Sequence, residues 1–263
     1  MATINGNDND NALRGTAQGD QIFGLDGDDT ISGLGGNDRL FGSDGKDFML
    51  GSLGQDFLSG GDDDDTLNGG TGDDTVSGGD GDDDLRGGQG DDTLNAGDGQ
   101  DRVFGNEGDD FILGGEGADI LGGGAGDDRL NGGEDDDRLF GGFGEDTLLG
   151  GNGDDTMFGA VGDDRLVGGD GDDVLNGGGG RDVLTGGDGS DTFVFQSGAD
   201  RITDFDRRDD TIDLTSVAGL STWSDVMDAA SDTSGGVVLS FTEGQLTITG
   251  LSMAGLQEDD FLF

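Results

Sequence analysis

The chain of 263 residues contains no cysteine, no proline and no histidine. The absence of cysteine and histidine excludes a disulfide framework, a zinc site of the usual Cys/His kind and a catalytic triad built on histidine. Basic residues are scarce, and 12 Lys and Arg against 60 Asp and Glu give a formal net charge of -48. Such a charge repels nucleic acid and anionic membrane surfaces, so we expect no nucleic-acid partner.

Long apolar runs are also missing, since none exceeds three residues. We therefore expect no transmembrane helix and no membrane insertion. The first thirty residues hold one basic residue, Arg14, and no long apolar segment, so we expect no Sec-type signal peptide. Low hydrophobicity with a high net charge would by itself predict an intrinsically disordered chain.

The order of the residues argues against disorder. The range Gly6–Val194 divides without insertion into 21 consecutive units of nine residues. Each unit reads roughly Gly-Gly-x-Gly-x-Asp-x-U-x, where U is apolar, as in residues 69–77. Position six is Asp in every unit but the first, which has Asn11, and position one is Gly in every unit but one, which has Ala96. A solvated linker has no reason to keep such a register.

Nine residues of this kind predict a turn followed by a strand. The glycines at positions one, two and four suit the first six residues to a tight turn, and the last three form a very short strand with U on one face. Two units make a coil, and about ten coils stacked at about 4.8 Å place the U side chains between two parallel sheets. The predicted fold class is all-β, a right-handed parallel β-roll solenoid of 18-residue coils.

Stacked coils bring like charges together. The position-six carboxylates, for example those of Asp74 and Asp92, would form a column with about one negative charge every 4.8 Å, which repels the coils. A cation between stacked turns removes this repulsion. Carboxylate and carbonyl oxygens select a hard cation, and a flexible cage of six or more oxygens suits Ca²⁺ better than Mg²⁺.

The repeat unit resembles the calcium-binding nonapeptide of the RTX (repeats-in-toxin) family, a parallel β-helix repeat. The resemblance implies that Ca²⁺ lies between repeats k and k+2, held by the position-six Asp of both turns and by nearby carbonyls, with up to about 19 ions. The implied metal ligands are Asp20, Asp29, Asp38, Asp47, Asp56, Asp65, Asp74, Asp83, Asp92, Asp101, Asp110, Asp119, Asp128, Asp137, Asp146, Asp155, Asp164, Asp173, Asp182 and Asp191.

Some units depart from the family pattern. Asn11 replaces the position-six Asp, Ala96 and Gln18 replace glycines, and Asp63 and Asp135 occupy position four. We expect weaker or missing sites around the first turn. An Asp at position four loses the flexibility of glycine and keeps the backbone carbonyl.

Residues 195–263 are not repeats and resemble the end of RTX β-rolls such as the serralysin C-terminal module. A short amphipathic helix is predicted from Ser221, its N-cap, with Trp223 on the apolar face. Residues 237–242 and 245–249 predict a hairpin. The predicted organisation is a lead-in at 1–5, the RTX β-roll at 6–194 and a capping and type I secretion-signal region at 195–263.

The last four residues, 260–263, join one acid to three apolar residues. This ending is similar to the uncleaved C-terminal signal of type I secretion substrates. It implies a secreted, extracellular protein and a type I exporter as a partner. The alternative is a strand edge that packs on the cap, and both can hold.

Position nine, which should face outward, carries apolar residues late in the repeat. Phe140 and Phe158 are predicted to stack on one sheet, and Leu149 and Val167 on the other. Either the C-terminal cap folds back over them, or they form a docking surface for self-association or for a surface partner.

Catalysis is not expected, because the carboxylates recur identically and no pocket drives two pKa values apart. The predicted function is that of a secreted calcium-binding β-roll that folds on extracellular Ca²⁺ and serves a structural, adhesive or matrix role. The alternative is the calcium-folding export module of a larger or truncated secreted enzyme or toxin, such as a protease, a lipase or a polysaccharide-modifying enzyme. Because the repeats begin at residue 6, behind a Met, we expect no catalytic domain ahead of them.

Overall fold

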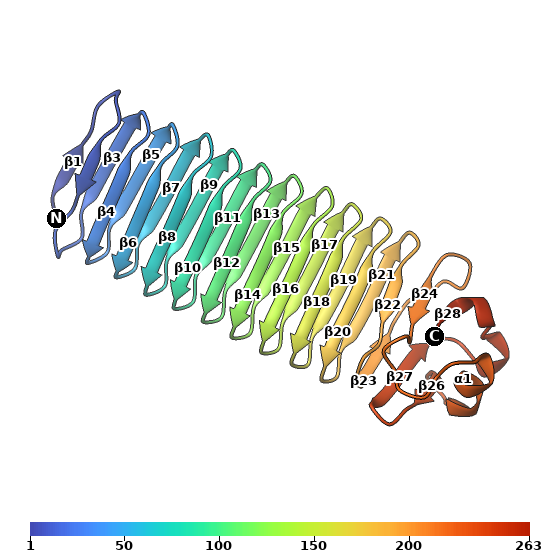
Figure 1. Ribbon diagram of the computed structural model, residues 1–263. Helices are drawn as coiled ribbons and strands as arrows, with labels where there is room; N and C mark the ends of the chain where they lie inside the picture. The colour runs from blue at the N-terminus through green and yellow to red at the C-terminus, as the bar shows by residue number, and fades with distance from the viewer. The chain divides into compact units, whose positions relative to one another are not determined.

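The computed structural model describes residues 1–263 and consists mostly of strands (Figure 1). The chain forms two compact units, Met1–Asp137 and Arg138–Phe263. Each unit is a parallel β-solenoid, and one short helix lies near the C-terminus. These observations confirm the predicted all-β solenoid.

Successive strands of the first unit alternate between two parallel sheets. The odd-numbered strands form one sheet and the even-numbered strands form the other. The odd-numbered strands are β1 (Thr3–Asn5), β3 (Gln21–Asp26), β5 (Arg39–Asp44), β7 (Phe57–Asp62), β9 (Thr75–Asp80), β11 (Thr93–Asp98), β13 (Phe111–Glu116) and β15 (Arg129–Glu134). The even-numbered strands are β2 (Ala12–Arg14), β4 (Thr30–Gly35), β6 (Phe48–Leu53), β8 (Thr66–Thr71), β10 (Asp84–Gln89), β12 (Arg102–Glu107) and β14 (Ile120–Ala125).

The apolar position-eight residues form the core of this unit. Leu85 on β10 pairs in register with Leu67 on β8 and Val103 on β12, so that equivalent positions stack. All three side chains are 0% exposed. Parallel pairing at a spacing of one coil thus places every U residue between the sheets, as the repeat predicts.

The strands are longer than the three residues that the repeat predicts. Strand β8 has six residues, from position seven of one unit to position three of the next. The pairing continues because Gly70, at position two, adopts a φ of 116° and still pairs with Gly88 of the next coil. The prediction of a six-residue turn is therefore wrong, and only positions four to six turn the chain.

The second unit continues the same alternation and ends in a cap. One sheet, called the β16 sheet, has the order β16-β18-β20-β22-β24-β28, and the other, the β17 sheet, has the order β17-β19-β21-β23-β27-β26-β25. The β16 sheet contains β16 (Arg138–Phe143), β18 (Thr156–Val161), β20 (Val174–Gly179), β22 (Thr192–Val194), β24 (Thr211–Asp213) and β28 (Phe261–Leu262). The β17 sheet contains β17 (Thr147–Asn152), β19 (Arg165–Asp170), β21 (Val183–Asp188), β23 (Gly198–Ile202), β27 (Gly244–Thr249), β26 (Gly236–Ser240) and β25 (Ala230–Asp232).

The predicted hairpin is present in the cap. Strands β26 and β27 are antiparallel, with Val237 opposite Ile248 and both side chains 0% exposed. Strand β27 also pairs in parallel with β23. The hairpin therefore closes the last coil of the β17 sheet with apolar side chains.

The helix α1 (Trp223–Ala229) begins one residue later than the sequence predicts. Its N-cap is Thr222, whose Oγ1 accepts a hydrogen bond from the backbone N–H of Asp225, while Oδ2 of Asp225 accepts one from the N–H of Thr222. The prediction of Ser221 as the N-cap is wrong. A capping box needs an acidic side chain three residues after the cap, and that residue stands at the right distance only from Thr222.

The C-terminal residues are built into the fold. After two short 3₁₀ turns, η1 (Met253–Gly255) and η2 (Glu258–Asp260), strand β28 pairs in parallel with β24. Phe261 is 5% exposed, and its ring lies 5.8 Å from that of Trp223. The terminus is thus a strand edge packed on the cap. The chain has no helix with the length and hydropathy that crossing a bilayer requires.

Candidate metal centre

The turns of both solenoid units hold the predicted metal ligands, the position-six aspartates. Every one of these side chains is buried, with at most 3% of its surface exposed. Burying carboxylates at this density requires compensation, because an ionised group loses its water. The geometry of the two oxygens of each carboxylate shows where compensation is present and where it is missing.

Within each unit, one carboxylate oxygen of the position-six aspartates ties neighbouring coils together. The backbone N–H of Asp74 donates to Oδ1 of Asp92, at a distance of 2.7 Å, and the N–H of Asp56 donates to Oδ1 of Asp74 in the same way. In the second unit, the N–H of Asp164 donates to Oδ1 of Asp182 at 2.9 Å. The structure therefore brings consecutive predicted ligands of each sheet edge together as a ladder of charge-assisted hydrogen bonds.

The other oxygen, Oδ2, has no hydrogen-bond partner at most rungs although it is buried. These orphaned atoms belong in the first unit to Asp29, Asp38, Asp47, Asp56, Asp65, Asp74, Asp83, Asp92, Asp101, Asp110 and Asp119, and in the second unit to Asp164, Asp173, Asp182 and Asp191. A buried acceptor without a donor is costly, and more so when it is charged. A bound cation would satisfy it.

The orphaned oxygens lie against the position-one glycines, and the space that a Cβ atom would need there is called here the position-one hollow. A Cβ atom built on Gly60 would collide with Oδ2 of Asp65 and would lie 2.8 Å from the carbonyl oxygen of Gly78 in the next coil. Position one has no partner in the pairing of β8 with β10, because the paired residues include Asn68 and Gly70 but not the residue between them. Oxygens from two different coils thus lie where they do only because glycine has no Cβ atom.

The donor set at this hollow consists of oxygen atoms. No three acidic side chains converge on one point in the chain. A cation would therefore take carboxylate oxygens from neighbouring turns and complete its shell with backbone carbonyls. Such a set fits Ca²⁺, which accepts six to eight oxygen ligands in flexible geometry. The residues that would hold it are the position-six aspartates, together with the position-one carbonyls.

Burial also changes the protonation of the ladder. It raises the pKa of Asp74 from 3.8 to about 7 and that of Asp65 to about 8, against the opposing effect of the backbone N–H that each accepts. Neighbouring carboxylates contribute to both increases in pKa. Without a cation, the fold thus favours protonated carboxyl groups near neutral pH. A divalent cation favours the ionised form and would oppose this shift.

Two ladder members were not predicted from the sequence. The N–H of Asp182 donates to Oδ1 of Asp200 at 3.1 Å, and the N–H of Asp191 donates to Oδ1 of Asp210 at 3.0 Å. Asp200 could have been found, because Gly198 precedes it at the repeat spacing, but Phe195 stands where position one would be. Asp210 could not, because one inserted residue shifts it out of the count of nine.

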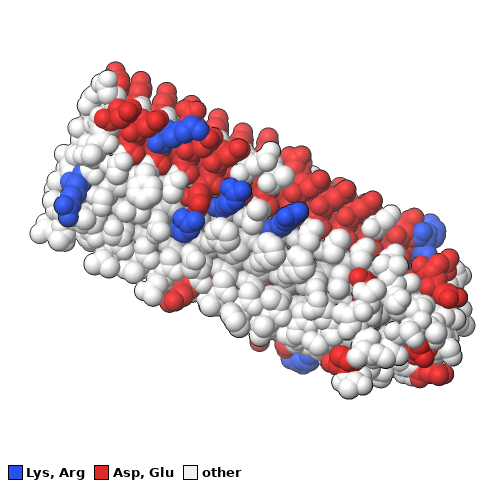
Figure 2. Space-filling model, viewed as in Figure 1, with Lys and Arg blue, Asp and Glu red and all other residues white.

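A second, exposed ladder runs through position five, in the opposite direction. The N–H of Asp91 donates to Oδ1 of Asp73 in the preceding coil, and the N–H of Asp109 donates to Oδ1 of Asp91. Figure 2 shows acidic side chains in rows along one edge of the face in view. These outer carboxylates keep contact with water, so they are poorer candidates for metal ligands than the buried ones.

The departures from the repeat have visible consequences. Asn11 is only half-buried, and its Oδ1 accepts a hydrogen bond from the N–H of Asn7. Ala96 is 0% exposed and carries a methyl group where other units have the position-one hollow. Asp63, at position four, adopts a φ of 78°, a conformation that Asp tolerates better than most residues. The weaker sites expected around the first turn stay a prediction.

The apolar residues at position nine lie as predicted. The rings of Phe140 and Phe158 stack at 5.3 Å with an interplanar angle of 4°, and Leu149 pairs with Val167. Phe140 is 41% and Leu149 39% exposed. The cap therefore leaves Phe140 and Leu149 uncovered, and the alternative in which it folds over these two residues is wrong, while Phe158 and Val167 are half-buried.

The ladder, the position-one hollow and the repeat all point to one family. The model of the RTX calcium-binding nonapeptide repeat (4 copies) matches residues 5–40, 23–58, 59–94, 86–121, 95–130, 113–148, 131–166 and 167–202. The chain belongs to the RTX family. Its repeats are calcium-binding repeats of a β-roll, which supports Ca²⁺ as the ion of this chain.

Solved structures similar to this RTX chain include a lipase and a subunit of an epimerase. The extracellular lipase LipA from Serratia marcescens is 20% identical, with a TM-score of 0.42, over 71% of this chain and 40% of the lipase. The AlgE6R3 subunit of the Azotobacter vinelandii mannuronan C5-epimerase is 33% identical, with a TM-score of 0.28, over 50% of this chain and 80% of the subunit. The RTX chain thus spans less than half of the lipase. No curated protein matches it.

Proposed function

We propose that the chain is a secreted calcium-binding β-roll that folds when it meets extracellular Ca²⁺ and serves a structural, adhesive or matrix role without catalysis. The observation that carries the proposal is the column of buried Oδ2 atoms without hydrogen-bond partners. Identical carboxylates repeated along a solenoid suit cooperative ion binding. They do not suit acid–base catalysis, which needs two carboxyl groups in different environments.

The calcium concentration supplies the switch. At a dissociation constant of about 10⁻⁴ M and a free Ca²⁺ of about 1 mM, each ion adds roughly 1.4 kcal/mol to the stability of the fold. At a cytosolic level of about 10⁻⁷ M the same ion adds almost nothing. Summed over up to about 19 ions, the difference decides whether the chain folds.

Export of an unfolded chain follows from this switch. The acid-plus-apolar terminus supports a type I exporter as a partner and an extracellular location. In the folded unit, Phe261 is buried in strand β28 and Asp260 lies beside Arg207, so a receptor would read this terminus only before folding. Deleting residues 260–263 should retain the protein inside cells that carry an exporter, as measured by its distribution between cells and medium.

The exposed stacks support a surface role. Phe140 with Phe158, and Leu149 with Val167, form outward apolar contacts on the two sheets of the second unit. We assign these stacks to contact with a partner in the extracellular matrix or with a second copy of the folded chain.

Circular dichroism with and without EDTA tests the proposed function. We expect the strand signal in calcium and its loss in chelator. Asp92→Asn should raise the calcium midpoint, because it removes the charge of a buried ladder member. Asp91→Asn is the matched control, because the carboxylate of Asp91 is exposed and belongs to the outer ladder. The calcium midpoint of this variant should stay at the wild-type value. A strand signal that persists unchanged in EDTA would refute the proposal.

A further inference from the structure

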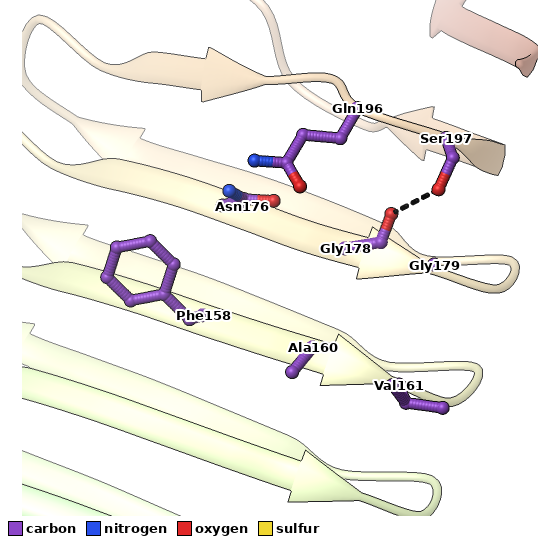
Figure 3. A pocket seen from close by; sticks show the side chains of 8 residues that line it. All are labelled: Phe158, Ala160, Val161, Asn176, Gly178, Gly179, Gln196 and Ser197. Carbon is purple, nitrogen blue, oxygen red and sulfur yellow. Dashed lines mark hydrogen bonds between the residues drawn. The ribbon is translucent and has the colours of Figure 1, made fainter. Parts of the chain in front are cut away.

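The second unit carries a groove of about 490 Å³ on the outer face of the β16 sheet (Figure 3). Its volume lies within the range of small-molecule sites. The residues that line it are Phe158, Ala160, Val161, Asn176, Gly178, Gly179, Gln196 and Ser197. They come from β18, β20 and the segment that follows β22.

The groove exists because strand β20 lacks side chains where its neighbour has them. Along position three, Phe143 pairs with Val161 and Val161 pairs with Gly179. Phe143 is 66% and Val161 55% exposed, so an outward apolar row stops at this glycine. On the far side, Oγ of Ser197 donates to the carbonyl oxygen of Gly178 at 3.2 Å and holds the opposite wall in place (Figure 3).

The position-nine row ends at the same strand. Phe140 stacks on Phe158, and Phe158 pairs in register with Asn176. An aromatic ring, fixed by its neighbour, therefore flanks the groove on the side of β18. Such a ring offers a flat apolar surface at low entropic cost, because the stack already restricts its rotation.

Amide groups supply the polar part of the groove. Asn176 is only 6% exposed, and its buried Oδ1 has no hydrogen-bond partner. Figure 3 shows the side chain of Gln196 reaching over the groove toward Asn176. Amides carry both donors and acceptors, so the pair can bind a ligand with hydroxyl groups and would satisfy the orphaned oxygen.

The lining contains no charged residue, in a chain with a net charge of -48. At the adjoining turn, the charges of Arg181 and Asp163 compensate each other in an ion pair. A cationic ligand would find no carboxylate in the groove, and an anionic ligand would be repelled by the acidic turns. The chemistry of the groove therefore selects a neutral ligand.

We propose that this groove binds a residue of a neutral polysaccharide. The sugar ring lies against Phe158, and its hydroxyl groups exchange hydrogen bonds with Asn176 and Gln196. The apolar row of Phe143 and Val161 extends the contact along the sheet. This assignment names a ligand class for the matrix role proposed above. It rests on the proposed function, because the groove requires a chain that calcium has folded.

Affinity electrophoresis in calcium, with the polysaccharide set in a native gel, tests the proposal. The probes are dextran, a β-1,3-glucan and a galactomannan, with alginate as the anionic comparison. Gly179→Val places a branched side chain in the groove. Its φ is not in the left-handed region, and a Cβ there meets nothing closer than Oγ of Ser197 at 3.4 Å. The matched control is Gly35→Val at the same repeat position in the first unit, where the Cβ has 3.7 Å to Leu53.

We expect at least one neutral polysaccharide to retard the wild-type chain. Gly179→Val should weaken that interaction by about tenfold or more, since it removes the space for the ring, and Gly35→Val should behave as the wild type. Asn176→Leu should weaken binding without lowering the melting temperature, because it removes an unsatisfied buried oxygen. A purely structural Asn176 would instead lower the melting temperature on substitution.

Four outcomes overturn the proposal: a folded wild-type chain that none of the three neutral probes retards, equal retardation by alginate, a Gly179→Val variant that binds as the wild type, or a wild-type dimer that Gly179→Val converts to a monomer in light scattering. Circular dichroism of the same samples separates the two proposals. A chain that does not gain strand signal in calcium refutes the calcium-folding function, whereas a folded chain that ignores the glycans refutes only the groove assignment.

Discussion

The backbone N–H of Asp74 donates a 2.7 Å hydrogen bond to Oδ1 of Asp92, one coil further along the solenoid. Oδ2 of Asp92 is buried and has no hydrogen-bond partner. The same carboxylate thus holds neighbouring coils together with one oxygen and lacks a partner at the other. Under the proposed function, this side chain couples calcium binding to coil stacking, and the following predictions probe that coupling.

The metal-free fold should be stabilised by acid. Burial raises the pKa of Asp74 and Asp92 to about 7, above the value of 3.8 expected for an exposed Asp. The folded chain then binds more protons than the unfolded chain between roughly pH 4 and 7, so stability is greatest below this window and is lost as the pH rises through it. In EDTA, we expect the strand signal in circular dichroism to increase as the pH falls from 7 to 4.

Calcium should reverse this dependence. Protons compete with Ca²⁺ for the same oxygens, so the calcium midpoint should rise on acidification. Titrations of calcium at several pH values measure it. A metal-free strand signal that grows toward alkaline pH would contradict the assignment of the raised pKa values to the ladder.

Ala96→Gly should open a position-one hollow. In chelator at about pH 4, where we expect the metal-free fold to form, the variant should be less stable than the wild type by about 0.5–1 kcal/mol, because glycine loses more backbone entropy on folding. In calcium the sign should reverse, since the variant gains at least one ion. Calcium stoichiometry and thermal unfolding in both conditions measure the reversal. The control is Ala125→Gly at an exposed position three, which should destabilise in both conditions.

Gly69→Ala is the opposite change. A Cβ on Gly69 collides with Oδ2 of Asp74, and its φ is not in the left-handed region, so any loss is due to the hollow rather than to backbone strain. We expect the variant to lose at least one bound ion and to require more calcium to fold. Gly35→Ala, where the Cβ has room, should keep the wild-type stoichiometry. An equal number of bound calcium ions in both variants would show that the position-one hollow is not part of the metal site.

Thr222→Ala should weaken the cap. It removes the side-chain oxygen that accepts from the N–H of Asp225, which typically costs about 1 kcal/mol. Trp223 is the single tryptophan of the chain and begins helix α1, so its fluorescence reports this loss during unfolding. Ser221→Ala removes only a 3.4 Å hydroxyl contact to Asp225 and should change the midpoint far less. The reverse order would restore Ser221 as the N-cap.

The repeat of nine determined the fold class, the residues of the core and the ladder, and the chemistry of the ion. Leu67, Leu85 and Val103 had to stack, because a repeat without insertions gives every strand the same register on its neighbour. The family match then follows from the same residues. Local periodicity suffices where each residue meets only its own equivalent in the next coil.

Only the tertiary structure decided the features that depend on contacts between different residues in neighbouring coils. The strands extend to six residues because Gly70 pairs across coils, and Asp210 joins the ladder across an inserted residue that breaks the count of nine. The groove beside Phe158 likewise arises where Gly179 follows Val161 in space, 18 residues later in the chain. These features are set by contacts between residues distant in sequence, so the composition of a single unit could not reveal them.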